Sequence, residues 1–186
     1  MVGHRPLEAR IGVQIPVPQP IIMIKKIRSN LRLYQTRFSF GMTSAIVTNL
    51  ALMVGLDWTI NPRMSIIAAI LVIALADNVA DSLGIHIFQE SEKVARSEVW
   101  FSTSTNFLAR FLVSMSFILL VVFLPITLAV PISLVWGLSL LALLSYVIAK
   151  DEGENPYLEI IKHVGIAVLV LITSELLSVL ISKTLR

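Results

Sequence analysis

Residues 66–92 read IIAAILVIALADNVADSLGIHIFQESE, and this stretch decides what kind of protein the chain is. It begins as an unbroken apolar run and then carries two carboxylates, Asp77 and Asp81, inside a predicted membrane-spanning helix. The two acids are four residues apart, so a helix places them on one face. An acidic side chain in hydrocarbon costs about 2.5–3.5 kcal/mol on insertion scales, so such residues usually line a polar path or a binding site.

The composition of the 186-residue chain indicates a membrane protein. Apolar residues make up 56% and charged residues 15%, whereas a soluble domain has about 45–50% and about 25%. The mean hydropathy is +0.84. The chain has no cysteine, which excludes disulfides, thiolate metal sites and cysteine nucleophiles. The formal net charge of +3 comes from a basic N-terminal segment, which in a membrane protein is a topology signal, so no nucleic-acid partner is expected.

The hydropathy pattern predicts an all-α integral membrane protein in two parts. Residues 1–37 are expected to form a cytosolic tail with a basic amphipathic helix on the membrane surface. Residues 38–186 are expected to form a five-helix transmembrane domain, because a span needs about 20 residues, with about 17 as the lower limit. Residues 125–131 are predicted to be a tight connection. The five predicted spans are residues 38–56, 64–88, 107–124, 132–149 and 157–182.

The distribution of Lys and Arg predicts the orientation of these spans. Five spans place the two termini on opposite sides of the membrane. Most Lys and Arg residues fall on the side of the N-terminal segment, so the N-terminus is predicted to be cytosolic and the C-terminus to lie on the other side. Arg110, near the start of the third predicted span, is expected to extend to the interface. The expected location is a prokaryotic inner membrane.

Two stretches of the sequence carry a resemblance to a known family. Residues 41–56 read GMTSAIVTNLALMVGL, and residues 76–93 read ADNVADSLGIHIFQESEK. Both are similar to the first two helices of the vacuolar iron transporter family, and the five predicted spans fit its layout. The resemblance implies a homodimer that exchanges divalent metal, chiefly ferrous iron, for protons along a path between the first two helices. This chain has Ser44 where the family carries an acid in its first span.

Oxygen donors on the first two predicted spans are the main candidate metal ligands. Divalent ions take carboxylate oxygens, so Asp77 and Asp81 are the expected centre of the site. Thr48 and Asn49, on the first span, would add neutral oxygen donors. The competing interpretation for all four residues is hydrogen bonding between neighbouring helices.

A second candidate group lies at the end of the second span and consists of His86, Glu90 and Glu92. His86 and Glu90 are four residues apart on a helix, which suits a metal-binding pair, and the negative charge would recruit cations to the entrance. The competing interpretation is an ordinary solvated helix end. Glu175 in the fifth span is expected either to take up a proton on the exit side or to pair with a polar group such as Arg110.

The expected function is the export of a divalent cation such as Fe²⁺ or Mn²⁺ from the cytosol, coupled to protons that compete for the same carboxylates. The expected partners are membrane lipid, the transported ion, protons and a second copy of the chain, with no resident cofactor. The sequence has no phosphate-binding loop, nucleophile elbow or HExxH motif, so no enzymatic activity is expected. Two alternatives stay open: a non-transporting membrane scaffold of the same fold that binds a partner, and a cation channel.

Overall fold

The computed structural model describes residues 41–184, and every regular element within this range is an α-helix. The predicted all-α class is therefore confirmed for the described residues, while the predicted tail, residues 1–37, lies outside them. The helices are the first helix (Gly41–Leu56), α2 (Pro62–Ser91), α3 (Arg96–Phe123), α4 (Ile126–Glu152) and α5 (Pro156–Thr184).

Four helices in the described part of the chain are long and apolar enough to cross a membrane. Helices α2 to α5 have 27 to 30 residues each, which corresponds to about 40–45 Å of helix against a hydrocarbon core of about 30 Å. The described part of the first helix, Gly41–Leu56, is apolar but shorter than a full span. The membrane-protein class is thus supported, and the fifth span and the orientation of the termini stay predictions.

Two helices begin earlier than the hydropathy pattern predicted. Helix α3 starts at Arg96, so Arg110 lies at the middle of a 28-residue helix instead of near an interface. Helix α4 starts at Ile126, so the predicted connection over residues 125–131 is wrong and Pro131 lies inside the helix. A proline five residues after a helix start removes a single early hydrogen bond, which membrane helices tolerate.

Local sequence explains where several helices start and stop. Pro62 occupies the first turn of α2, where its missing N–H has no intrahelical acceptor to lose. Gly153 ends α4 in the left-handed region with a φ of 78°, and its N–H donates to Ala149 O. Arg63 Nη2 donates to Leu124 O over 2.8 Å, which joins the start of α2 to the end of α3.

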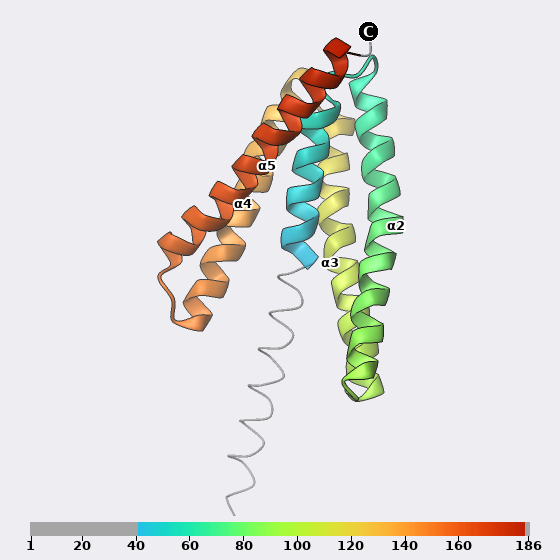
Figure 1. The fold of residues 1–186 in the computed structure, drawn as a ribbon, viewed down its shortest axis with the longest axis vertical. Coiled ribbons are helices and arrows are strands. Elements are labelled where there is room, and N and C mark those ends of the chain that lie inside the picture. Colours follow the sequence, from blue (N-terminus) through green and yellow to red (C-terminus); the bar gives the residue numbers. More distant parts are fainter. Residues whose placement is uncertain (1–40, 185–186) are drawn as a thin grey trace, which may run out of the picture. The chain divides into compact units, whose positions relative to one another are not determined.

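The described helices pack as two antiparallel pairs with the first helix against them. Helices α2 and α3 share the most extensive helix contact among the labelled helices, and α4 and α5 form the second pair (Figure 1). The first helix bonds to α3, because Asn49 Nδ2 donates to Ser114 Oγ over 3.0 Å. It also packs tightly on α4, where a Cβ built at Gly137 would lie 2.7 Å from the Leu50 side chain.

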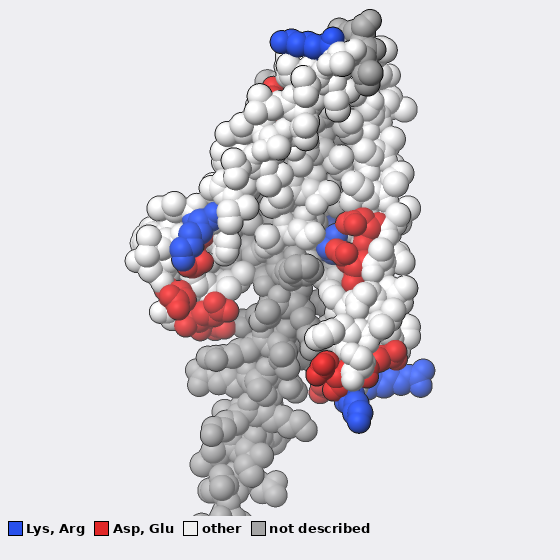
Figure 2. Space-filling view, viewed as in Figure 1, with Lys and Arg blue, Asp and Glu red and all other residues white. Residues whose placement is uncertain are grey.

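Charged side chains are sparse along the helices on the face shown in Figure 2. They gather near the helix ends, and one group of acidic and basic side chains lies midway along α2 (Figure 2). Long uncharged surfaces between charged ends match a helix bundle whose flanks contact lipid. The large apolar side chains exposed along α2 to α5 are consistent with this.

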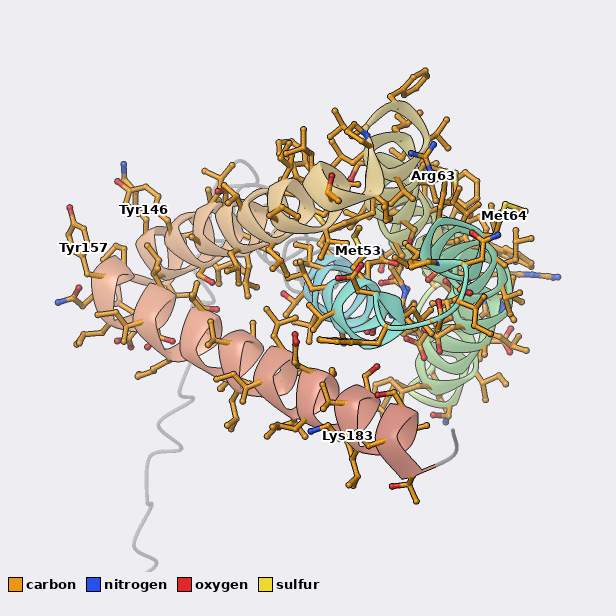
Figure 3. All side chains as sticks on the ribbon, turned by 90° about the horizontal axis from the view of Figure 1, so that it is seen from above. Met53, Arg63, Met64, Tyr146, Tyr157 and Lys183 are labelled. Atoms are coloured by element: carbon orange, nitrogen blue, oxygen red, sulfur yellow. The ribbon has the colours of Figure 1, made fainter. Side chains whose placement is uncertain are left out.

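An apolar core fills the half of the bundle nearest the turn at residues 57–61. Met53 is fully buried and points into the bundle, whereas Met64 points away from it (Figure 3). The residues of this half that we call the apolar half-core are Ile46, Leu50, Met53, Ile66, Ile70, Val113, Phe117 and Val121.

Candidate functional site

The structure brings both predicted carboxylates of α2 to a single arginine of α3. The Arg110 side chain is 1% exposed, and its Nη2 donates to Asp77 Oδ2 over 2.6 Å. Its Nη1 donates to Asp81 Oδ2. Its Nε donates to Asn78 Oδ1 over 2.7 Å, so all three acceptors come from about one turn of α2. We call Asp77, Asp81 and Arg110 the charged triad.

The charged triad lies far from either end of two membrane-length helices. Asp77 is at the middle of the 30-residue α2, and Arg110 is at the middle of the 28-residue α3. About 20 Å of helix therefore separates Asp77 and Arg110 from each end of their helices. The red and blue group midway along α2 in Figure 2 marks this position.

The charged triad is only partly neutral and only partly buried. Two carboxylates face one guanidinium, so one negative charge is left over. The guanidinium is buried, but the side chains of Asp77 and Asp81 are 46% and 38% exposed. An unpaired charge at the centre of a membrane helix costs about 2.5–3.5 kcal/mol on insertion scales. The exposed part of the carboxylates is consequently open to a further positive charge or hydrogen-bond donor.

Buried polar side chains continue from the charged triad toward the connection between α2 and α3. We call these residues the polar seam: the buried Asn78, Ser82 and Gln89 on α2 and Ser102, Asn106 and Arg110 on α3, together with the partly buried His86 and Thr103. The α3 members Ser102, Asn106 and Arg110 recur every four residues, so they form one stripe of that helix. All three are buried.

Hydrogen bonds pair the two helices along the polar seam. Asn106 Nδ2 donates to Ser82 Oγ over 3.3 Å, and Gln89 Nε2 donates to Ser102 Oγ over 2.9 Å. Several buried amide atoms of the seam have no partner among the described residues, namely Asn78 Nδ2, Gln89 Oε1 and Asn106 Oδ1. A buried polar atom without a partner costs about 1–3 kcal/mol, so the seam is incompletely satisfied by protein groups.

The second predicted group is found at the end of α2, away from the charged triad. His86 Nδ1 lies 3.1 Å from Thr103 Oγ1, and its Nε2 lies 3.4 Å from Glu90 Oε1. The Trp100 ring contacts the imidazole edge-on with centroids 4.6 Å apart. Glu92 is exposed beyond the last turn of α2. His86 and Glu90 thus form a pair as the spacing predicted, with Glu90 58% exposed.

The first helix does not direct its predicted ligands to the carboxylates. Asn49 bonds to Ser114 on α3, and Thr48 lines an open groove of about 970 Å³ between the first helix and α5. Adjacent residues on a helix point about 100° apart, which explains why neighbours in the sequence face different elements. No group of three His, Asp or Glu side chains gathers within metal-binding reach anywhere in residues 41–184.

Glu175 of α5 has a different partner from the one considered for it. Its Oε1 accepts a hydrogen bond from Trp58 Nε1 over 3.3 Å, at the turn that follows the first helix. Arg110 bonds to α2 instead. Burial, and secondly the negative charge of Glu175, raise the pKa of Asp57 in the same turn.

Sequence reasoning missed Arg110 as the partner of the carboxylates. The prediction placed residue 110 near the start of a span, because the polar residues 96–106 were read as preceding the third helix. The repeat of Ser102, Asn106 and Arg110 every four residues was the available signal for a longer helix with a polar stripe.

Comparison with known proteins supplies no family for this arrangement. The chain matches no protein-family model, and neither the curated proteins nor the solved structures searched contain a match. The resemblance to vacuolar iron transporters over residues 38–93 therefore stays a prediction, and the charged triad has to be interpreted from its own chemistry.

Proposed function

We propose that this protein moves a cation across the membrane, with Asp77 and Asp81 as the carboxylates that bind it. The observation that carries the proposal is the charged triad at the middle of two membrane-length helices. Ionisable groups at that depth are costly, and they usually belong to ion pathways or proton relays. The half-exposed carboxylates and the leftover negative charge give a cation a reason to bind there.

Arg110 acts in this proposal as a resident counter-ion that the transported cation displaces. The guanidinium and an incoming ion compete for the same oxygens of Asp77 and Asp81. When an ion arrives, Arg110 keeps Asn78 Oδ1 as an acceptor and so does not become a buried charge without a partner. Departure of the ion lets the guanidinium return to the carboxylates, which are also the groups that protons would occupy.

The proposed cargo is a divalent metal ion such as Fe²⁺ or Mn²⁺, moved out of the cytosol in exchange for protons. Carboxylate oxygens suit divalent ions, and the charged triad provides two carboxylates. Protons compete with metal for carboxylates, so one site can couple the two fluxes. A homodimer, in which two copies would each contribute such a site, belongs to the same proposal.

A second proposed function is a non-transporting role in membrane assembly. Both carboxylates of the triad are paired with Arg110, and such pairs between neighbouring helices can hold a bundle together. In that case a basic side chain of a partner helix would meet the exposed side of the carboxylates and balance the leftover charge. The two proposals differ in whether the carboxylates support flux.

Reconstitution of the full chain into liposomes with an internal Mn²⁺-sensitive dye separates these functions. A transporter gives pH-gradient-dependent dye quenching that Asp77→Asn and Asp81→Asn each abolish. Asp151→Asn, at the exposed end of α4, is the matched control and keeps the flux. Folded protein without flux in any variant contradicts transport and supports the assembly role. Flux that ignores the pH gradient supports a channel instead.

A further inference from the structure

The α2–α3 interface changes character at the charged triad. From Asn78 to Gln89 the buried side chains of α2 are polar, and they face polar side chains of α3. From Ile66 to Ala74 the buried side chains of α2 are apolar, and the facing part of α3 presents Phe117 and Val121. One end of the same helix pair is therefore lined by hydrogen-bonding groups and the other end is sealed by hydrocarbon.

We infer that the polar seam is a water-filled route that enters at the connection between α2 and α3, reaches the charged triad and ends there. The inference deepens the proposed transport function, because it assigns the side from which water and small cations reach Asp77 and Asp81. It rests on the side-chain contacts between α2 and α3, and its test does not measure transport.

The unpartnered amide atoms are the first argument for water in the polar seam. Gln89 Oε1 is buried near the α2–α3 connection and Asn78 Nδ2 at the triad, and Asn106 Oδ1 is buried between these levels against Gly41 of the first helix. Each belongs to a residue that is no more than 2% exposed. Buried polar groups are normally satisfied, and a water molecule with two to four polar neighbours is the usual partner where protein groups are missing.

The charges at the two ends of the polar seam are the second argument. At its mouth, the acids Glu90, Glu92 and Glu98 outnumber the bases Lys93 and Arg96 by one, and Glu90 is 58% exposed beside His86. At its inner end, the triad holds one negative charge in excess. A path with negative charge at both ends concentrates small cations and repels anions.

The apolar half-core closes the route beyond the triad. Ile66, Ile70 and Phe117 are all completely buried, and Ala74 continues their row on α2 up to Asn78. An apolar interior of this kind stays dry, because it offers water no hydrogen-bonding partners.

Single cysteines test the route cleanly, because the chain has none of its own. Ser82→Cys and Ala74→Cys are a matched pair: both residues are buried on the same face of α2, one turn either side of Asn78. Ser102→Cys reports the same route nearer its mouth. The full-length variants are reconstituted in liposomes and treated with the cationic reagent 2-aminoethyl methanethiosulfonate or the anionic 2-sulfonatoethyl methanethiosulfonate. Only a hydrated, ionised thiol reacts at an appreciable rate.

The expected result is a gradient of labelling that stops at the triad. Ser102→Cys reacts fastest, Ser82→Cys follows, and Ala74→Cys reacts about tenfold or more slowly than Ser82→Cys, with the cationic reagent preferred about tenfold over the anionic one. Equal rates at residues 74 and 82, or no labelling at 82 and 102, overturn the route. Labelling in dodecyl sulfate checks that every thiol is present, and size-exclusion chromatography checks that each variant is folded.

The labelling experiment and the Mn²⁺ flux experiment test separate proposals, so either can fail while the other succeeds. If the gradient holds and no variant transports Mn²⁺, the hydrated route stands and the proposed transport function falls. If Mn²⁺ flux depends on Asp77 and Asp81 but residue 82 is no more reactive than residue 74, the carboxylates transport ions and this route to them is wrong.

Discussion

The two halves of the α2–α3 interface hold the same two helices together through different interactions, polar in one half and apolar in the other. The polar seam joins the helices through side-chain hydrogen bonds and two ion pairs to Arg110. The apolar half-core joins the same helices through Ile66, Ile70, Phe117 and Val121. In a membrane, apolar packing surfaces are not driven together by water, because lipid tails solvate them equally well. The polar seam is therefore the part that fixes which residues of α2 face which residues of α3.

The apolar half-core contributes close fit instead of specificity. Its side chains gain dispersion contacts that lipid cannot match only where the surfaces interlock. Gly137 is a point of close approach in this half, where α4 packs against Leu50 of the first helix. We therefore expect charge removal to damage the polar seam most and added volume to damage the apolar half-core most.

Replacing Arg110 by Met is expected to have the largest effect. It leaves two carboxylates halfway along α2 without a counter-ion. Breaking a buried ion pair costs about 3–5 kcal/mol, and the partial exposure of Asp77 and Asp81 places the expected loss at the lower end of this range. The measurement is unfolding in mixed micelles with increasing dodecyl sulfate. Arg110→Lys is the control. Its loss is expected to be smaller because a positive charge remains, and a loss is expected because one ammonium nitrogen cannot replace the three guanidinium nitrogens that reach Asn78, Asp77 and Asp81. A loss below about 1 kcal/mol would mean that the triad does not hold the helices together.

Gly137→Ala tests the apolar half-core by adding volume. The new Cβ would meet the Leu50 side chain at 2.7–2.9 Å, so α4 or Leu50 has to shift. Overpacking of this kind costs about 1–3 kcal/mol. Gly165→Ala on α5 is the matched control, since nothing lies within 4 Å of its added Cβ. Equal stability of the two variants in the same unfolding assay would contradict a tightly fitted apolar half.

Much of the apolar half was predictable from sequence, and the key contact of the polar half was not. The apolar run at residues 66–76 predicts a span by its length alone, and helix α2 covers it. The shared face of Asp77 and Asp81 also followed from helical spacing. Their partner did not, because Arg110 is 29 residues beyond Asp81 and only helix packing brings them together.

The start of α3 shows why hydropathy misplaces such contacts. Residues 96–106 are too polar to be counted as part of a span, yet their helix continues without interruption into residues 107–123. Thr48 and Asn49 show the same limit. They are adjacent in the sequence, but the sequence does not predict that Asn49 faces α3 and that Thr48 faces the groove beside α5. The rotation of a helix about its own axis relative to its neighbours is set by tertiary packing, and the residue pattern of one sequence does not predict it.

Asn49→Leu tests the boundary between the two halves with a smaller expected effect. The substitution removes the bond from Asn49 Nδ2 to Ser114 Oγ and also removes the unpartnered Asn49 Oδ1. Hydrogen bonds between membrane helices are worth about 0.6 kcal/mol on average. Removing the unsatisfied oxygen offsets part of that loss, so the variant is expected to stay within about 0.6 kcal/mol of the original protein. Ser114→Ala leaves Asn49 Nδ2 buried without an acceptor, so this variant is expected to be the less stable of the two.

Asp57→Asn has the smallest expected effect. It tests whether the ionised Asp57, at the apolar end of the bundle, lowers the stability of the folded protein. Asp57 lies in the turn after the first helix, and burial, followed by the charge of Glu175, raises its pKa above the ordinary 3.8. Between that value and the raised pKa, the folded protein binds more protons than the unfolded chain, so its stability falls as pH rises. The favourable contribution is complete below the ordinary pKa and is lost as pH rises through the folded one. Asp57→Asn removes the titration, so the variant gains on the original protein in thermal unfolding as pH rises above the ordinary pKa of 3.8, by a small margin because the side chain is exposed. Glu175→Gln removes only the second cause, the nearby negative charge, and is expected to give part of the gain. Parallel pH profiles for all three proteins would show that the turn does not raise the pKa of Asp57.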